Sequence, residues 1–318
     1  MYHWPRNASR LGRWAANDFF RPAAPHGRGG WVRWRKTKRR LTHLLAMKTW
    51  LTCLWLSGLP VAALAQTTPL AFSAQPDAQL AAIFQRSAPT EPYLVTLRTT
   101  YGLDSVGAGK TTDLARVQAM CAWVSRQWQH NGSNEPSKSD ALTILQEAAQ
   151  GKRFRCVEYG ITLSAALNAV GIPARTLGLM MADVETRKAG AGHVLTEAWL
   201  RDQRKWVLVD GQWDVIPFLN GVPLNAVELQ QALAARSPGF AVRSRRGTTA
   251  KKFAGWILPY LYYFDTGFDQ RYVAKKERGS LMLVPVGAKQ PTVFQRKYPL
   301  ANYTYTHSTA SFYAPPSS

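Results

Sequence analysis

The hydrophobic pattern of this sequence changes its period once, and that change limits the folds open to the chain. Up to Gly171 the apolar residues recur mostly at helical spacing, whereas beyond Pro173 they alternate with polar residues over short runs. A period near 3.6 indicates helices with one buried face, and a period of two indicates strands. Helices first and strands afterwards predict an α+β fold, with the strands in an antiparallel sheet.

Three strong helices are expected before the change. The first follows Thr112, which can cap it, and the third starts near Cys156. Between them, residues 140–150 are expected to form a second helix that ends at Gly151. The first helix has one apolar stripe, which consists of Leu114, Val117, Cys121, Val124 and Trp128. The third helix is apolar or small at nearly every position from 161 to 170, so we expect it to be buried on most sides.

Three strands are expected directly after the change, at residues 174–181, 193–200 and 205–210. The last hundred residues hold further short runs typical of strands, at 260–264, 280–286, 291–295, 302–308 and 312–315. Their many aromatic residues predict a β-rich C-terminal extension. We expect most of these aromatic side chains in the core and the rest on a groove.

The front of the chain carries a large share of its positive charge. The net charge is +21, and residues 1–65 hold 12 of the 40 Lys and Arg but only one of the 19 Asp and Glu. The rest of the chain therefore carries 28 basic and 18 acidic residues, which is basic but not unusual. We expect no nucleic-acid partner.

Residues 47–65 have the pattern of a secretory signal peptide. A lysine is followed by an apolar run, a Gly-Leu-Pro break and the tripeptide Ala-Leu-Ala, after which Gln66 would start the mature chain. The uncharged stretch from 49 to 65 has 17 residues with a break, which is short for a membrane span of about 20 residues. We expect an exported protein, periplasmic or extracellular, with no stable membrane span after cleavage. An uncleaved anchor is the alternative.

These patterns divide the chain into five parts. Residues 1–46 show neither period and are expected to be a disordered basic leader or a start-site artefact, with translation from Met47. A short helix is expected at 76–88. The five expected parts are the leader at 1–46, the signal peptide at 47–65, a helical and irregular segment at 66–110, a core at 111–216 and the β-rich extension at 217–318.

Two cysteines, Cys121 and Cys156, remain after residue 65. In an oxidising compartment such a pair suggests a disulfide. Cys121, however, lies within the apolar stripe of its helix, where a buried thiol is the simpler interpretation. Cys156 stands behind Arg153 and Arg155 at the first turn of a buried helix, and both the helix N-terminus and nearby cations favour a thiolate. We therefore predict two free cysteines, with Cys156 as a candidate nucleophile.

A thiol nucleophile needs a base. Three histidines follow residue 65, and two of them are expected to be structural or solvated: His130 in a polar loop and His307 in a strand rich in Thr and Tyr. The third, His193, follows the glycine-rich run KAGAG and opens a predicted strand. It is the candidate base.

A carboxylate partner for this base follows from strand pairing. If the second and third predicted strands form a hairpin with a loop at 200–203, Asp210 lies directly opposite His193. A tighter loop would place Asp210 opposite Leu195, still on the same face of the sheet. Glu197 shares that face and is the competing carboxylate.

At these residues the sequence resembles the transglutaminase-like proteins, which are thiol enzymes with a papain-like fold. The resemblance covers roughly residues 111–216 and rests on three segments: RFRCVEYGITLSAALNAVGIPARTLGL, GAGHVLTEAWL and RKWVLVDGQWDV. It implies a papain-like, transglutaminase-type core in which Cys156 is the nucleophile, His193 is the general base and acid, and Asp210 orients His193. The glycine that usually stands close before the family's cysteine is absent, and Phe154 precedes Arg155 there instead.

An acyl-transfer site also needs hydrogen-bond donors for a developing oxyanion. The backbone N–H of Cys156 is one candidate. The side chains of Gln150 and Trp128 are two others, because side-chain donors stand upstream of the cysteine in papain-like and transglutaminase enzymes. The sequence has neither a paired His/Cys spacing nor a carboxylate-rich calcium loop, so no metal and no other cofactor is expected.

The combined expectation is a cysteine hydrolase or acyltransferase that acts on amide or peptide bonds through an acyl-enzyme, with hydrolysis favoured. Acyl transfer to amines, which cross-links proteins, is one alternative. A non-catalytic binding or scaffold module on the same fold is the other. The expected partner is a peptide or protein substrate, and the basic surface after residue 65 would suit an acidic polymer of the cell envelope.

Overall fold

The computed structural model describes residues 68–78, 80, 84–272 and 279–316. The predicted leader at 1–46 and the predicted signal peptide at 47–65 lie outside these residues. The described residues belong to one compact unit. None of their helices combines the length and the apolar character that a membrane crossing requires.

Five helices precede the first strand of the described residues. They are α1 (Pro92–Thr100), α2 (Leu103–Val106), α3 (Asp113–Val124), α4 (Ala141–Ala149) and α5 (Cys156–Ala169). Thr112 caps α3 by accepting a hydrogen bond from Ala115 N at 3.2 Å. Asp140 caps α4 in the same way, with Thr143 N as the donor at 2.9 Å. The three helices predicted from periodicity are confirmed.

The helix predicted at 76–88 is wrong. Its described residues form no helix, and Gln85 instead makes a bridge with Asp269, far along the chain. The helices of this front segment are α1 and α2. Before α1, Glu91 accepts a hydrogen bond from Leu94 N at 3.3 Å, and a proline occupies the first turn, which is a local signal for a helix start.

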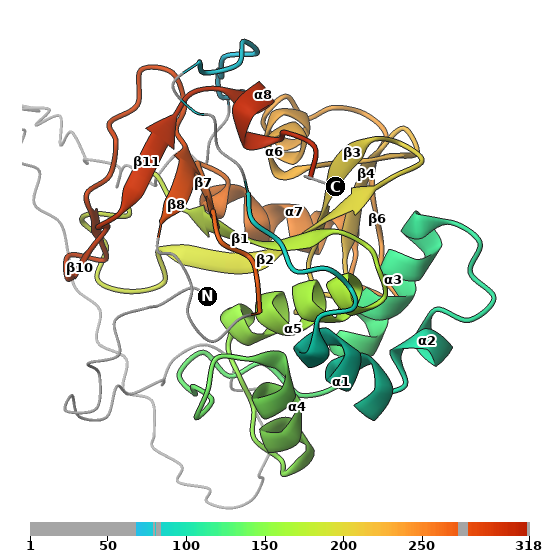
Figure 1. Ribbon diagram of the computed structural model, residues 1–318. Coiled ribbons are helices and arrows are strands. Elements are labelled where there is room, and N and C mark those ends of the chain that lie inside the picture. The colour runs from blue at the N-terminus through green and yellow to red at the C-terminus, as the bar shows by residue number, and fades with distance from the viewer. Residues whose placement is uncertain (1–67, 79, 81–83, 273–278, 317–318) are drawn as a thin grey trace, which may run out of the picture. The chain divides into compact units, whose positions relative to one another are not determined.

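A six-stranded sheet forms the centre of the described residues (Figure 1). In spatial order its strands are β11 (Tyr303–Thr306), β8 (Ser280–Leu283), β7 (Tyr263–Gly267), β1 (Ala174–Met180), β2 (Gly192–Leu200) and β3 (Lys205–Val209). Neighbouring strands pair antiparallel except β11 and β8, which are parallel. The C-terminal strands that were predicted as an extension therefore continue the sheet of the predicted core, because β7 pairs directly with β1.

The other elements follow β3 in sequence. They are β4 (Ile216–Leu219), β5 (Val222–Pro223), α6 (Ala226–Ala234), β6 (Phe240–Arg243), α7 (Ala250–Ile257), the 3-10 helix η1 (Leu258–Tyr260), β9 (Val293–Phe294), β10 (Tyr298–Pro299) and α8 (Thr309–Phe312). The strand predicted at 312–315 is wrong. Ser308 caps α8 at this point by accepting a hydrogen bond from Ser311 N at 3.0 Å, so the chain turns into a helix.

The central sheet is covered on both faces (Figure 1). Val194 and Ala198 of β2 pack in the core formed with α1 to α5, whereas Leu195 packs in the core formed with α6 and α7. Because both faces are covered, β2 is buried along almost its whole length. Gly160 lets α5 approach β2 closely, since a Cβ there would lie 3.0 Å from both Leu195 O and Val194 Cγ1.

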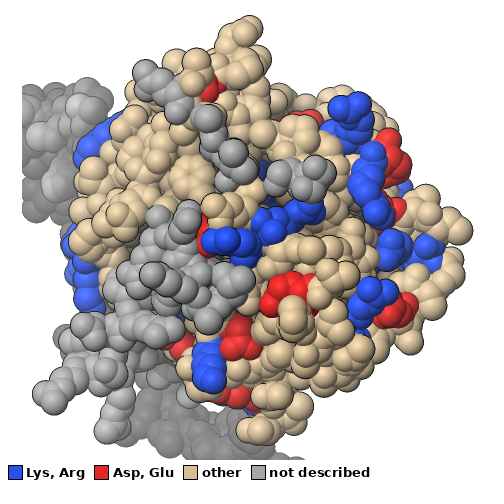
Figure 2. All heavy atoms as spheres, in the orientation of Figure 1, with Lys and Arg blue, Asp and Glu red and all other residues tan. Residues whose placement is uncertain are grey.

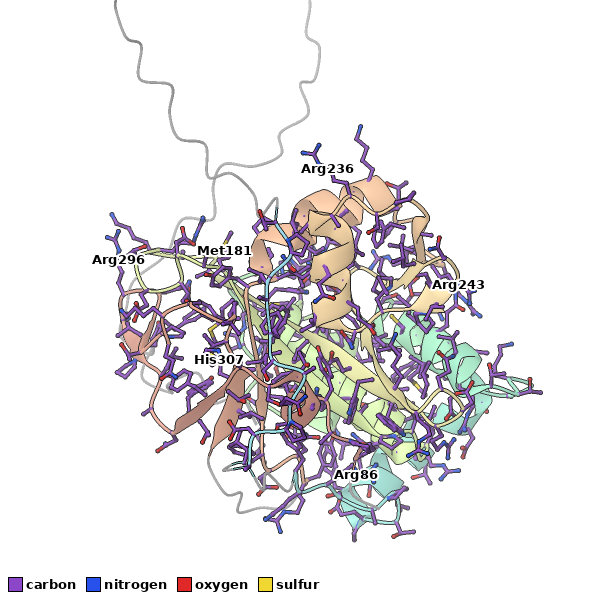
Figure 3. The ribbon with its side chains drawn as sticks, turned by 90° about the horizontal axis from the view of Figure 1, so that it is seen from above. Arg86, Met181, Arg236, Arg243, Arg296 and His307 are labelled. Carbon is purple, nitrogen blue, oxygen red and sulfur yellow. The ribbon has the colours of Figure 1, made fainter. Side chains whose placement is uncertain are left out.

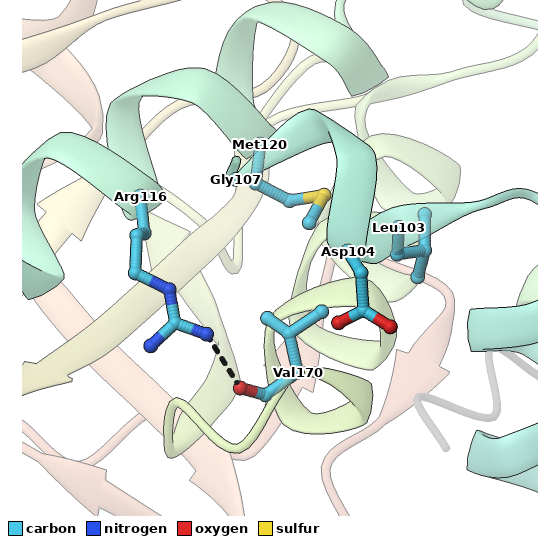
Figure 4. Close-up of a pocket in the computed structure, with 6 residues that line it drawn as sticks. All are labelled: Leu103, Asp104, Gly107, Arg116, Met120 and Val170. Carbon is cyan, nitrogen blue, oxygen red and sulfur yellow. Dashed lines mark hydrogen bonds between the residues drawn. The ribbon is translucent and has the colours of Figure 1, made fainter. Parts of the chain in front are cut away.

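A small cavity of about 50 Å³ lies between α2, α3 and the C-terminal end of α5 (Figure 4). Arg116 reaches along it and donates a hydrogen bond from Nη2 to Val170 O at 3.0 Å. Val170 caps the end of α5 that is opposite to Cys156. At 1.5 Å per residue the two ends of this helix are about 20 Å apart. The cavity is therefore remote from the candidate nucleophile and too small for a peptide.

Candidate active site

Cys156 is the first residue of α5, and its side chain is partly buried. The helix can start here because Glu158 accepts a hydrogen bond from Arg155 N at 3.0 Å. The Arg155 guanidinium pairs with Glu158 at 2.8 Å and also with Glu135. Two carboxylates thus engage this arginine, and the support of its charge for a thiolate at Cys156 stays a prediction. The helix N-terminus remains the local source of positive potential.

His193 and Asp210 form a buried pair at one end of the sheet. His193 Nε2 lies 2.9 Å from Asp210 Oδ2, and the two side chains are only 2% and 1% exposed. His193 is the second residue of β2 and Asp210 directly follows β3, so the antiparallel hairpin brings both to the same end. Glu197, the competing carboxylate, is held elsewhere by Arg175, whose Nη2 lies 2.7 Å from Glu197 Oε2.

The register of this hairpin decides how the pair meets. Thr196 pairs with Val209, so Asp210 follows opposite Leu195 and not opposite His193. The first predicted register is therefore wrong, and the register of the alternative, which offsets the two residues on one face, is confirmed. The tighter loop that was predicted with it is wrong, because the loop spans residues 201–204. Diagonal neighbours on one face of a sheet remain within reach of long or aromatic side chains.

The Asp210 carboxylate makes His193 a stronger base. Burial by itself disfavours the imidazolium, but the charge and hydrogen bond of Asp210, together with the adjoining Cys156 thiol, outweigh burial and raise the pKa of His193 from 6.5 to about 10. Because Nε2 faces Asp210, Nδ1 is the nitrogen left for the Cys156 sulfur. An imidazolium between a carboxylate and a thiolate is the charge arrangement of an activated thiol.

The second oxygen of Asp210 is held by the turn that follows β3. Oδ1 accepts hydrogen bonds from Gln212 N at 2.9 Å and from Trp213 N at 3.0 Å. From inside the core, the Cys121 thiol donates to the backbone carbonyl of Asp210 at 3.4 Å. The carboxylate is thus fixed from the side away from His193. Cys121 is buried and, like Cys156, free, which confirms the prediction of no disulfide between them.

Residues 103–211 match the model of the family described as the Transglutaminase-like superfamily. This stretch is a transglutaminase-like domain. It overlaps the predicted core at 111–216 and contains Cys156, His193 and Asp210. No curated protein matches the chain.

Solved structures resemble parts of the chain at low identity. A candidate cysteine protease from Cytophaga hutchinsonii is 18% identical over 48% of this chain and 50% of its own, with a TM-score of 0.30. A TGase of known structure is 18% identical over 37% of this chain and 31% of its own, with a TM-score of 0.28. The red sea bream transglutaminase is 14% identical over 37% of this chain and 25% of its own, with a TM-score of 0.26. The chain spans half or less of the length of each.

Three aromatic side chains from outside the transglutaminase-like domain stand beside its buried histidine. They are called the aromatic wall here and consist of Trp213, Trp256 and Tyr260. The Trp256 ring meets His193 nearly edge to face, at 4.6 Å between centroids and 83°, and the Tyr260 ring lies 6.0 Å away. Trp213 packs on Trp256 at 4.9 Å. The sequence predictions missed this wall. Its one local signal was the three-to-four spacing of Phe253, Trp256 and Tyr260, which is typical of a helix face.

The two side-chain donors predicted for the transglutaminase-like domain lie in different surroundings. Trp128 is 6% exposed and packs on Phe154 and Tyr159, which flank Cys156 in the sequence, at 5.7 and 4.5 Å between ring centroids. Its Nε1 is buried and has no hydrogen-bond partner among the described residues. Gln150 is exposed as the C-cap of α4.

His130, which was predicted to be structural or solvated, is an exposed residue whose backbone lies close to the start of α5. Its backbone forms a bridge with Phe154, two residues before Cys156. Desolvation and the positive charge of His193 lower the pKa of the His130 imidazole, and the charge of Asp210 opposes them. The imidazole thus lies within electrostatic reach of the buried pair. Its polar loop concealed this, because the bridge joins two segments that are far apart in the sequence.

The third histidine has a separate, structural contact. His307, labelled in Figure 3, interacts through Nδ1 with Val284 O at 2.7 Å. Within the part of the chain that the structure describes, no three His, Cys, Asp or Glu side chains are grouped so that they could hold a metal ion.

Proposed function

We propose that this chain is an exported cysteine hydrolase that cleaves amide or peptide bonds with Cys156, His193 and Asp210. The observation that carries the proposal is the buried contact between His193 Nε2 and Asp210 Oδ2, at 2.9 Å, beside the thiol at the start of α5. An oriented base next to a thiol at a helix N-terminus is what acylation of a cysteine requires. The transglutaminase-like domain that contains the three residues supports the same chemistry.

In the proposed acylation step, the Cys156 thiolate attacks the carbonyl carbon of the amide. A C–S bond forms as the carbonyl π electrons move onto oxygen. Trp128 Nε1 and the backbone N–H of Cys156 are the candidate donors to this oxyanion. When the oxyanion collapses, the C–N bond breaks, and the imidazolium of His193 gives its proton to the leaving amine.

In the proposed second step, the now neutral His193 takes a proton from water, whose oxygen attacks the thioester. The C–S bond breaks, which releases the carboxylic acid and restores the thiolate and imidazolium. Asp210 orients the imidazole in both steps through Nε2. Hydrolysis is favoured over transfer because water is far more abundant than any free amine, and transfer needs an amine bound against the thioester.

The proposed place of action is outside the cytoplasm, in the periplasm or the extracellular space. It rests on the signal-peptide pattern at residues 47–65, which lie outside the described residues. A peptide or protein of the cell envelope is the proposed substrate, since an exported hydrolase meets the envelope first.

Labelling with fluorescent iodoacetamide tests the proposed nucleophile. At about pH 6 an ordinary thiol, with a pKa of about 8.5, is almost fully protonated and reacts slowly. We expect rapid labelling of the folded protein from which residues 1–65 have been removed. The label should be lost in Cys156→Ala, and the rapid phase should be lost when the protein is unfolded in denaturant. Cys121 is buried and should stay unlabelled until the protein unfolds.

Two matched Asp→Asn variants test the proposed triad. Asp210→Asn keeps an oxygen acceptor but removes the charge beside His193. Because a hydrogen bond to a charged group contributes about 1.5–3 kcal/mol, labelling at about pH 6 should slow by roughly tenfold or more. Asp202→Asn, in the exposed loop after β2, should leave the rate unchanged. If Cys156 labels as slowly as an ordinary thiol in the unaltered protein, and neither substitution changes that rate, the scaffold alternative is favoured.

A further inference from the structure

The segment that leads into α7 carries several basic residues and has no acidic residue near it in the sequence. No Asp or Glu occurs between Glu228 and Asp265. Five basic side chains at residues 243–252, named the basic arm here, are all exposed: Arg243, Arg245, Arg246, Lys251 and Lys252. None of the five forms an ion pair with a carboxylate among the described residues. Figure 3 shows Arg243 at the outer surface of β6.

Several basic residues elsewhere among the described residues pair with a nearby carboxylate. On the face shown in Figure 2, basic and acidic side chains lie next to one another over α1 to α4. Arg98 pairs with Asp104 at 2.7 Å, and Lys152 pairs with Glu147 at 2.7 Å. Such pairs cancel locally, whereas the basic arm leaves its charge to solvent.

The backbone of the basic arm is fixed although its side chains are exposed. The buried Asp214 accepts hydrogen bonds on Oδ2 from Arg245 N at 2.6 Å and from Arg246 N at 2.9 Å. Thr248 Oγ1 donates to Trp213 O at 2.9 Å. The Asp214 carboxylate thus binds the backbone of the arm and not its side chains. The Arg243 guanidinium stacks on the Phe218 ring at 4.1 Å from its centroid, which leaves its charge without a carboxylate partner among the described residues.

Ring contacts connect the basic arm to the candidate active site. Lys252 Nζ lies 5.2 Å from the centroid of Trp213, which packs on Trp256, and Trp256 in turn contacts His193. At the other side, Arg246 Nη1 donates to Ser125 O at 3.0 Å, just after α3. The arm therefore borders the aromatic wall that covers the histidine.

We propose that the basic arm is a substrate subsite for acidic peptide segments. Carboxylates that flank the reacting amide would pair with Arg243, Arg245 and Lys251, while the aromatic wall contacts the chain between them and the thiol. Arginine and lysine on a rigid backbone suit carboxylates, and uncompensated charge steers an oppositely charged ligand to the site. This inference rests on the proposed function for the reacting bond, and its charge preference is independent of it.

The test measures binding rather than turnover. Cys156→Ala protein is titrated into a short fluorescein-labelled peptide rich in glutamate, and fluorescence anisotropy gives the dissociation constant at low and high salt. The variant Arg243→Gln/Arg245→Gln/Lys251→Gln should weaken binding about tenfold, since each exposed charge contributes a modest amount and salt screens it. A control with the same charge loss, Lys110→Gln/Lys138→Gln/Arg204→Gln, changes exposed residues outside the arm and should bind as the parent does.

Further variants and peptides distinguish an effect of charge on binding from an effect on folding or on the reaction. The variant Arg243→Lys/Arg245→Lys/Lys251→Arg keeps the charge and should retain binding, and a peptide with glutamine in place of glutamate should bind weakly to every variant. Equal affinity of the arm variant and the parent, or equal loss in the control, would overturn the subsite. Tighter binding of duplex DNA than of the acidic peptide would overturn it as well. Failure of Cys156 to label, by contrast, would count against the proposed function alone.

Discussion

At the scale of single residues, His193 is buried between a charged carboxylate and an apolar aromatic ring. The Asp210 carboxylate lies 2.9 Å from Nε2, and the Trp256 ring closes another side at 4.6 Å between centroids. Because water is largely excluded there, the carboxylate charge is weakly screened and acts strongly on the ring. Burial opposes the charged ring, yet Asp210 and Cys156 raise the pKa of His193 to about 10.

The raised pKa of His193 predicts a definite pH dependence of stability. Its imidazolium contributes to the free energy of unfolding in full below pH 6.5 and loses that contribution as the pH rises through about 10. The loss of stability in His193→Asn should therefore be largest near pH 6 and shrink towards about pH 10. Each unit of pKa shift is equivalent to about 1.4 kcal/mol, so urea denaturation across this range can resolve the trend.

His130→Asn is the matched control, with the opposite sign. Desolvation and the charge of His193 lower the pKa of His130, so its charged form is penalised in the folded protein. The penalty applies at low pH and disappears as the pH rises through 6.5. If the effect of His193→Asn stayed constant or grew with pH, the described pairing with Asp210 would be contradicted.

The buried indole N–H of Trp128 lowers the stability of the folded protein, and the packing of the ring does not explain why it is kept. Its indole N–H is buried without a partner among the described residues. Buried tryptophan N–H groups usually find an acceptor, and an unsatisfied buried donor costs about 1–3 kcal/mol. The proposed role of Trp128 as a donor to the substrate oxygen would give this N–H an acceptor in the complex. The Trp213 N–H is buried without a partner among the described residues in the same way.

At the scale of elements, α5 positions the thiol because its start and its faces are both fixed. Nearly all of its residues after Cys156 are buried, and Tyr159 Oη donates to Trp128 O at 2.8 Å. At the far end, the Asn168 amide donates to Ala174 O at 2.8 Å, which ties the helix to the start of β1. The first turn therefore has little freedom to move relative to β2.

Glu158 gives a test of how this first turn is held. It is fully buried, accepts a hydrogen bond from Arg155 N and pairs with the Arg155 guanidinium. Burial raises the pKa of Glu158 and Arg155 opposes that rise, so desolvation offsets what the ion pair contributes. Glu158→Gln keeps the capping acceptor and should cost less than about 1 kcal/mol, whereas Glu158→Ala removes it and should cost about 2 kcal/mol. Urea denaturation measures both, and equal losses would show that the charge matters more than the cap.

At the scale of the whole molecule, the C-terminal residues form part of the central sheet and are not a separate extension. Tyr263 and Phe264 of β7 pair with Met180 and Leu179 of β1, and Leu179 pairs on its other side with His193. The strand that supports the histidine is thus braced from the C-terminal third. Arg175 of the same strand donates to Phe312 O at 2.9 Å, close to the end of the described residues.

Export is the prediction that concerns the chain as a whole. When the full sequence is produced in a bacterial host, the mature protein should begin near Gln66 and be recovered outside the cytoplasm, because residues 47–65 have the signal pattern. Mass spectrometry of the recovered protein gives its N-terminus. Ala65→Asp, which alters the small residue before the cleavage point, should block processing. A mature protein that still carries residues 1–46 would rule the proposal out.

The sequence by itself determined what depends on neighbours within a few residues. Thr112 and Asp140 could be identified as caps, because the N–H groups they accept lie three positions along the chain. The start of the buried helix at Cys156 and the hairpin that carries His193 followed from periodicity in the same way. The face shared by His193 and Asp210 needed only the alternation of a strand.

The tertiary structure decided whatever depends on contacts between distant segments. The hairpin register was one such case. Arg204 closes the loop with a positive φ of 48°, a conformation that is uncommon for residues other than glycine and that an arginine in the sequence does not predict. The pairing of Arg155 with Glu135, the aromatic wall over His193 and the joining of β7 to β1 were others. Periodicity reports which side of an element is buried, but the partner on that side is chosen by packing the whole chain into one core.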